Sequence, residues 1–442
     1  MLEILRKGMI SAAMLLLTFP MPVHGQTNRT TVTVGPADAD VVGTDNVAIQ
    51  QAIDRVAKAA GGTVLIKAGT YTLINSVRLA SHVVLRGEGA DKTILKKGPG
   101  FKSRLKLDAD YGELVATVED AHGFAPGMGV TIVDKQNRDG WVPSVRTLVR
   151  VEGEQLFFDR FLHMDYSVAN AGEVFNHFPL VVGYEVEDVV VERLTADGNR
   201  AETGYLDGCQ SGAIYFFHSQ RMTIRSCVAR NFSGDGISTQ FVEDPVIEDC
   251  EAHGNAGLGI HLGTGALRGV VRRNRSHNNE QDGIFLCWRV QHGTFEDNQS
   301  WANGRDGFSI GHKDTDNSFA RNVVRENARA GVYFRDEEEI NAGHRNTFRE
   351  NVIEDNGRPD SPGYGVRIEG ATHHLTFVAN TIRDTRQGAK ATQEVGISIG
   401  SKADYVTCER NTLDGNARRD IVDQSTGGHN RIDQPAPSRA AR

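Results

Sequence analysis

Two stretches, residues 283–287 (GIFLC) and 307–311 (GFSIG), carry the pattern that decides the fold. In each, a glycine is followed by apolar residues at alternating positions. The pattern occurs eight times from Gly212 to Gly396, at steps of 23 or 24 residues up to Gly331 and at longer steps after it. Alternation with a period of two is typical of short β-strands, and a nearly fixed step indicates a repeat array.

An asparagine follows the repeat glycine by 15 residues in most repeats, and a second asparagine often comes five residues later. After Gly331 the bare count reaches Asn346, but the match between TFREN and TFEDN favours Asn351 instead. That choice implies a five-residue insertion within residues 337–345. The first set of asparagines is then Asn274, Asn298, Asn322, Asn351, Asn380 and Asn411. Stacked coils would align these amides, so we expect hydrogen-bonded ladders.

This combination predicts a β-solenoid, in which each coil buries its apolar side chains by stacking on its neighbours. A leucine-rich repeat has a similar length, but its LxxLxLxxN signature is absent. Residues 45–60 form an amphipathic helical pattern with Thr44 or Asp45 as the N-cap, and such a helix would cover the N-terminal end of the solenoid. Residues 101–170 break the repeat and contain short strand patterns, which indicates a β-rich insertion.

The N-terminus has the features of an export signal. Two basic residues, an apolar run of about 11 residues and the small-residue sequence Val23-His24-Gly25 match a secretory signal peptide. We therefore expect a secreted or periplasmic protein, cleaved near Gly25. The predicted organisation is a signal peptide at 1–25, an N-terminal cap and first coils at 26–100, a β-rich insertion at 101–177, β-helix coils at 178–424 and a flexible tail at 425–442.

The amino-acid composition limits the kinds of binding partner that can be expected. A formal net charge of −8 argues against nucleic acid or an anionic membrane surface as the main target. No apolar run is long enough to span a membrane, and we expect a monomer. The five cysteines are odd in number and lack metal-like spacing, so no disulfide scaffold is implied. Cys227 and Cys250 would lie on adjacent coils, either bridged or as a stacked thiol pair.

The repeats, together with the opening segments at residues 43–54 and 60–71, resemble the parallel β-helix proteins of the pectate-lyase-like superfamily. The resemblance covers roughly residues 32–100 and 178–420. It implies an all-β, single-stranded right-handed parallel β-helix of about ten coils, with the capping helix and the insertion added. It also implies a polysaccharide or oligosaccharide as the partner.

Alternation assigns the two faces of each strand. Counting from the repeat glycine, positions +1 and +3 point inward and positions +2 and +4 point outward. On three or four consecutive coils the outward positions and the following turn gather aromatic and titratable side chains, which predicts a carbohydrate cleft. We expect Gly263 and Gly311 to leave grooves for the ligand. The predicted substrate-binding residues are Gln240, His261, Trp288, Arg289, Tyr333 and Glu337, and the predicted catalytic residues are Lys313, His312, Arg335, Asp314 and Asp336.

Several functions fit this cluster. In β-elimination on a uronate polymer, Lys313 acts as the base while Arg289 and Arg335 bind the carboxylate. In hydrolysis, Asp314 and a carboxylate of the next coil, from Asp336 or the acid after it, flank the scissile bond. A lyase is the leading prediction. A glycoside hydrolase, a C5-epimerase and a non-catalytic glycan-binding or envelope β-helix are the alternatives, and a charge-balanced surface would explain the same residues without a ligand.

Three acids, Asp235, Asp282 and Asp306, directly precede repeat glycines. Their placement is similar to the acidic patch of calcium-dependent pectate lyases. Leu258 interrupts the column, which favours a role in capping turns. We therefore predict no metal site from these residues, and calcium dependence stays open.

Overall fold

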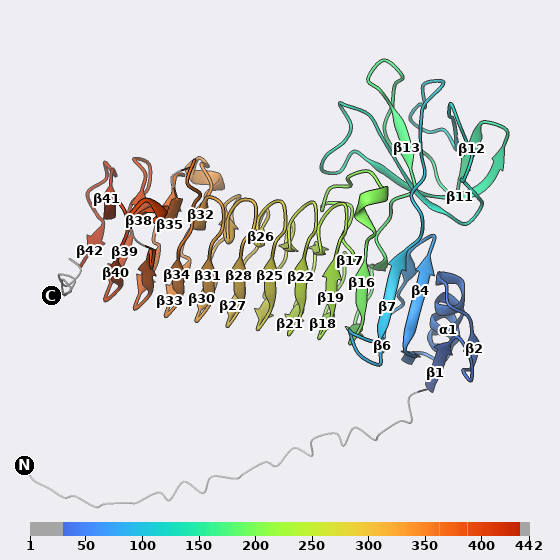
Figure 1. Cartoon of the computed structure of the whole chain (residues 1–442), viewed down its shortest axis with the longest axis horizontal. Helices are drawn as coiled ribbons and strands as arrows, with labels where there is room; N and C mark the ends of the chain where they lie inside the picture. The colour runs from blue at the N-terminus through green and yellow to red at the C-terminus, as the bar shows by residue number, and fades with distance from the viewer. Residues whose placement is uncertain (1–29, 362, 387, 434–442) are drawn as a thin grey trace, which may run out of the picture.

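The chain winds as a continuous coil whose strands form three parallel sheets. The computed structural model describes residues 30–361, 363–386 and 388–433, so the predicted signal peptide lies outside the described residues. Each coil contributes one strand to each sheet, and every neighbour within the three sheets is parallel. Figure 1 shows the coils as one elongated stack. The predicted all-β parallel β-helix is confirmed.

Sheet 1 carries the repeat glycines. Its strands are β5 (Val77–Arg78), β14 (Val181–Tyr184), β17 (Ile214–Phe217), β20 (Ile237–Gln240), β23 (Ile260–Leu262), β26 (Ile284–Leu286), β29 (Phe308–Ile310), β32 (Ala330–Phe334), β35 (Gly363–Ile368), β38 (Gln393–Ile399) and β41 (Arg419–Asp423).

Each coil enters sheet 2 directly after its first ladder asparagine, from Asn274 onward. Its strands are β4 (Gly69–Leu73), β7 (Thr93–Lys97), β16 (Thr195–Asp197), β19 (Val228–Arg230), β22 (Glu251–His253), β25 (Arg275–His277), β28 (Gln299–Trp301), β31 (Val323–Arg325), β34 (Val352–Glu354), β37 (Thr381–Arg383) and β40 (Thr412–Asp414).

Sheet 3 begins with the N-terminal strands. Its strands are β2 (Val41–Val42), β1 (Thr30–Gly35), β3 (Gly62–Ile66), β6 (Val83–Gly87), β15 (Val190–Glu192), β18 (Thr223–Arg225), β21 (Val246–Glu248), β24 (Val270–Arg272), β27 (Thr294–Glu296), β30 (Ser318–Ala320), β33 (Thr347–Arg349), β36 (Thr376–Val378), β39 (Thr407–Glu409) and β42 (Arg431–Ile432).

The interior is held by stacked aromatic rings and by amide ladders. Phe295, Phe319 and Phe348 stack on successive coils with centroids 4.7 and 4.3 Å apart. In the turn beside them, the side-chain amide of Asn322 donates to Oδ1 of Asn351 at 2.9 Å, which confirms Asn351 as the equivalent ladder position. Because these amides are buried and satisfied from coil to coil, they fix the register of the stack.

The amphipathic segment forms the capping helix α1 (Asn46–Lys58). The Asp45 side chain accepts a hydrogen bond from the amide of Ala48 at 2.8 Å, as expected of an N-cap. Ile49 and Ile53 on its buried face belong to the same core as the first coils. No helix in the described part of the chain is long and apolar enough to cross a membrane.

The insertion is an antiparallel sheet with its own apolar core. It projects from the N-terminal end of the stack (Figure 1). Its strands are β8 (Lys102–Arg104), β9 (Val115–Thr117), β10 (Gly129–Val133), β11 (Ser144–Glu152), β12 (Gln155–Phe158) and β13 (Glu173–Phe175).

Three short 3-10 turns complete the described elements, and two details refine the sequence predictions. The turns are η1 (Arg200–Glu202), η2 (Glu339–Asn341) and η3 (Gly388–Lys390).

Strand β42 pairs with β39, so the last coil extends into the segment that was expected to be a flexible tail. All five cysteines are free thiols. Cys227 and Cys250 are therefore neighbours without a bridge, and their thiols donate to carbonyls inside the stack.

Candidate functional site

The outward face of sheet 1 carries the predicted cluster. His261, Phe285, Ser309 and Tyr333 are paired in register across β23, β26, β29 and β32. The alternation therefore predicted correctly which side chains share this face. In the first coil all four residues after Gly212 are apolar, so alternation assigns no face there, and the register places Tyr215 on the same face, opposite Ser238.

A second layer of chain covers part of this face. Residues 206–211, here called the cover segment, lie over β20 and β23. The carbonyl of Gly208 accepts hydrogen bonds from Ser238 Oγ at 2.6 Å and from Gln240 Nε2 at 3.2 Å. Gln240 and His261 are fully buried, so the prediction that both line an open cleft is wrong. Alternation reports the side of the sheet to which a residue points, but it carries no information about a segment that folds over that side.

The two predicted grooves are also filled. A Cβ atom at Gly263 would lie 2.1 Å from the amide of Gln240, and one at Gly311 would lie 2.8 Å from Nε of Arg335. Each glycine thus makes room for a long side chain from the neighbouring coil. The prediction that these glycines leave space for a ligand is wrong.

Arg335 folds back over Gly311 to reach Asp314. Its Nη2 lies 3.1 Å from Asp314 Oδ2, and its guanidinium lies 4.5 Å from the centroid of the Phe285 ring. Asp314 is fully buried and also accepts hydrogen bonds from the amides of Val290 and Gly311. Burial raises the pKa of Asp314 to about 6, against the attraction of Arg335.

This pair is therefore part of the turn and not an exposed catalytic pair. A buried Asp314 does not meet the requirement of hydrolysis for two carboxylates that flank a bound sugar. Asp336, its predicted partner, is exposed and forms an ion pair with Lys402 at 3.1 Å. The predicted hydrolytic pair of Asp314 with Asp336 or Glu337 therefore fails at Asp314, which is fully buried.

Beside this pair, Trp288, His312 and Glu337 form an accessible group. The Trp288 side chain is 50% exposed, and its ring centroid lies 5.2 Å from that of His312. His312 Nε2 lies 2.6 Å from Glu337 Oε1. Burial and the nearby charge of Arg335 lower the pKa of His312 to about 4, while burial raises the pKa of Glu337. At neutral pH the imidazole of His312 is therefore uncharged.

Arg289 directly follows Trp288, and Lys313 directly follows His312. The two cationic residues occupy the same turn position on adjacent coils. Both have φ of 68°, and the amide of Arg289 donates to the carbonyl of His312 at 2.9 Å. Neither cationic group pairs with an acid among the described residues. The nearby acids are already engaged, since Glu337 contacts His312 and Asp336 contacts Lys402.

Five other arginines in the turns of the coils behave differently. Each of them pairs with acids of the preceding coil, which is what a charge-balanced surface predicts. These arginines are Arg221, Arg268, Arg273, Arg321 and Arg345. The charge-balanced alternative therefore holds for these five arginines but not for Arg289 and Lys313.

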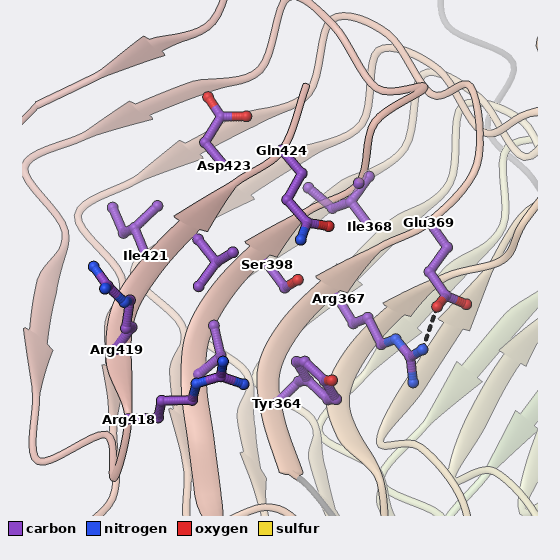
Figure 2. A pocket seen from close by; sticks show the side chains of 13 residues that line it. Tyr364, Arg367, Ile368, Glu369, Ser398, Arg418, Arg419, Ile421, Asp423 and Gln424 are labelled. Carbon is purple, nitrogen blue, oxygen red and sulfur yellow. Dashed lines mark hydrogen bonds and ion pairs between the residues drawn. The ribbon is translucent and has the colours of Figure 1, made fainter. Parts of the chain in front are cut away.

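Two further groups complete the face. Tyr333 is half-buried and donates to Glu369 Oε2 at 2.5 Å, and Glu369 also pairs with Arg367. Arg367 and Glu369 border a cavity of about 420 Å³ at the C-terminal end of sheet 1, where Arg418 and Arg419 also lie (Figure 2). Positions +2 and +4 after Gly365 are Arg367 and Glu369, so alternation places both on the outward face. It does not predict the cavity, because the last repeats are irregular in length.

The acids before the repeat glycines cap turns. Asp306 Oδ1 accepts the amide of Ala330, and Asp282 Oδ1 accepts that of Asp306. Asp235 accepts the amide of Leu258 and holds His261 Nδ1 at 2.8 Å. Burial is the largest single effect and opposes charge on the ring, but the hydrogen bonds and charges of Asp235 and Cys287 together outweigh it and raise the pKa of His261 to about 10. These contacts agree with the predicted structural role.

Family and structure comparisons agree with this architecture. Residues 191–341 match a family model described as "Right handed beta helix region", and residues 31–138 match one described as "Rhamnogalacturonase A/epimerase, pectate lyase-like". The chain is a right-handed parallel β-helix protein. No curated protein sequence matches this β-helix.

Solved structures share the fold at low sequence identity. The A-module of the mannuronan C-5 epimerase AlgE6 from Azotobacter vinelandii is 16% identical over 88% of this chain and 93% of its own, with a TM-score of 0.55. The surface adhesin PfbA of Streptococcus pneumoniae is 14% identical over 87% and 84%, with a TM-score of 0.56. The catalytic domain of a GH87 alpha-1,3-glucanase is 11% identical over 87% and 66%, with a TM-score of 0.51. Identities this low establish the fold alone.

Proposed function

We propose that this β-helix acts outside the cytoplasm on an acidic, uronate-containing polysaccharide and cleaves it by β-elimination. The observation that carries the proposal is the stacked pair of cations, Arg289 and Lys313, beside the exposed ring of Trp288. Two cations without an acid partner favour an anionic ligand. They stand out because the chain as a whole has a net charge of −8 and so has acids in excess. An exposed indole offers the apolar surface on which a sugar ring packs.

In this mechanism Arg289 binds the substrate carboxylate and Lys313 removes the neighbouring proton. Arginine is suited to the first role because its planar guanidinium matches a carboxylate with two parallel hydrogen bonds. The electron pair of the broken C5–H bond forms the C4=C5 double bond, and the C4–O bond breaks. The leaving oxygen takes up a proton, and Lys313 returns to its amine by releasing its own. The neutral His312, held by Glu337, supports the wall of this site beside Trp288.

Epimerisation at C5 is the second candidate, because it begins with removal of the same proton. It is favoured by the fold shared with two mannuronan C-5 epimerase modules of Azotobacter vinelandii, at TM-scores of 0.55. The two reactions differ in their second step, since epimerisation returns the proton to the opposite face of C5, whereas elimination expels the glycosidic oxygen. Hydrolysis by the predicted carboxylate pair is disfavoured because Asp314 is buried.

The test is incubation with a panel of polyuronates while ultraviolet absorbance is followed. Elimination produces a conjugated unsaturated uronate and therefore new absorbance, and the Lys313→Ala and Arg289→Ala variants should lose it. Arg345→Ala is a matched control, because Arg345 is also exposed at a turn but pairs with Asp316. New reducing ends without absorbance would contradict elimination. Deuterium uptake at C5 in heavy water without chain cleavage would establish epimerisation, and binding without any turnover would identify a glycan-binding protein.

A further inference from the structure

A separate cavity of about 510 Å³ lies where the insertion meets the first coils of sheet 1. Gln210 of the cover segment joins the two parts, since its Nε2 donates to the carbonyls of Trp141 and Pro143 at 2.7 and 2.9 Å. The walls of the cavity therefore come from distant parts of the chain that are held together. The residues that define its chemistry are Arg78, Trp141, Arg146, Arg160, Tyr184 and Phe217.

The cavity is rich in positive charge. Three guanidinium groups line it, against a single carboxylate, that of Glu185. Arg78 lies over the ring of Tyr184, 5.8 Å from its centroid, and pairs with no acid among the described residues. Arg160 is 61% exposed, and its closest acid is the adjacent Asp159, at 3.5 Å. Both therefore keep donors free for a ligand.

The third guanidinium, of Arg146, is buried without a carboxylate. It donates to the carbonyls of Phe161 and Val145 and to Nδ1 of His163. Burial, together with the charge of Arg160, lowers the pKa of Arg146. Burial also lowers the pKa of His163, so its ring adds no charge. A desolvated cation whose hydrogen bonds go only to neutral acceptors favours an anion nearby.

Aromatic rings form the other wall. Trp141 is 40% exposed, and its ring centroid lies 5.7 Å from that of Phe217. Tyr184 is 39% exposed and lies 5.9 Å from Tyr215. Exposed rings beside guanidinium groups match a ligand that combines an apolar ring face with a carboxylate. A uronic acid has both.

We propose that this cavity is a remote subsite for a uronate unit of the same polysaccharide, with its carboxylate on Arg78 and Arg160 and its ring face on Trp141. This inference rests on the proposed function, because the same chain would also reach Arg289 and Lys313. Strand β5, which carries Arg78, and strand β26 are five positions apart in sheet 1, which is about 24 Å at the spacing of neighbouring strands. Several linked sugar units are needed to occupy both places, so a long substrate gains contacts that a short one lacks.

The test compares long and short uronate oligosaccharides on wild type and on the double variant Arg78→Ala/Arg160→Ala. Loss of two charge-assisted contacts should weaken binding of long oligosaccharides about ten-fold or more and leave the shortest ones unchanged. Binding is measured by calorimetry on the full chain, so the result does not depend on turnover. The matched control is Lys106→Ala/Arg150→Ala, which removes the same charge from the insertion outside the cavity.

The outcomes separate the two proposals. If binding depends on Arg78 and Arg160 but no unsaturated product forms, the subsite stands and β-elimination fails. If the double variant binds long oligosaccharides like wild type, the subsite is refuted. If sulfated neutral glycans bind through these arginines and uronates do not, the assignment to a uronate is also refuted. Circular dichroism verifies folding, which is expected because both side chains are exposed.

Discussion

Replacing Arg335 by methionine separates a structural role from a catalytic one. The substitution keeps an unbranched side chain over Gly311 but removes the guanidinium that lies 3.1 Å from Asp314. Asp314 is then left fully buried with only the amides of Val290 and Gly311 as partners. Removing one member of a buried ion pair costs about 3–5 kcal/mol. That is a large share of a typical unfolding free energy of about 5–15 kcal/mol.

The pH dependence of this cost has a definite sign. The pKa of Asp314 in the folded protein is about 6, above its ordinary value of 3.8. Its burial therefore costs nothing at low pH, where the carboxyl is protonated in both states, and costs most above the folded pKa. Without Arg335 the pKa rises further. The stability deficit of Arg335→Met should be largest above about pH 7 and should shrink as the pH falls toward 4.

Urea unfolding at neutral and acidic pH measures both effects. Arg289→Ala is the control, because that side chain is exposed and unpaired, and its loss should change the unfolding free energy by less than about 0.5 kcal/mol. The double variant Arg335→Met/Asp314→Asn should recover part of the loss, since no charge is left buried. An Arg335→Met protein that unfolds at the same urea concentration as wild type at neutral pH would refute the reasoning.

Three further outcomes are expected. Asn298→Ala orphans the buried amide of Asn274 and should lower the unfolding free energy by about 2 kcal/mol in urea titrations. Gly263→Ala places a Cβ against Gln240 and should cost about 1–3 kcal/mol, seen as a lower thermal midpoint. Ellman titration in denaturant without reductant should find five thiols per chain, and fewer would indicate a disulfide.

The fold could be predicted from the sequence because its signals are local and repeated. Strand alternation, the repeat glycine and the asparagine positions recur on each coil, so each coil gives independent evidence for the same register. The choice of Asn351 over Asn346 shows the strength of this register, since Asn346 belongs to a different ladder, in which it accepts from Asn317. The residues around the start of the helix likewise limited the N-cap to Thr44 or Asp45, and the structure places it at Asp45.

The site could be predicted only in part, because its contacts join segments far apart in the sequence. Alternation placed His261 on the outward face, but the cover segment that buries it follows no repeat. The repeat pattern also could not predict that Arg335 of the next coil fills the space above Gly311. By contrast, Trp288, Arg289 and Lys313 lie at a turn that each coil repeats, so their clustering could be predicted from spacing.

Two clusters of unpaired cations on one face argue for a single extended ligand. Several arginines elsewhere on the coils pair with acids of the preceding coil, as Arg268 does with Asp244. A rigid parallel stack keeps such distances fixed, so a cation that lacks an acid cannot easily move to find one. The guanidinium of Arg78 and the pair at Arg289 and Lys313 both lack one. Arg78 lies on strand β5 of sheet 1, and Arg289 and Lys313 lie in turns that follow strands of the same sheet. An anionic chain laid along the coils would therefore neutralise both, whereas two small ligands would need two unrelated explanations.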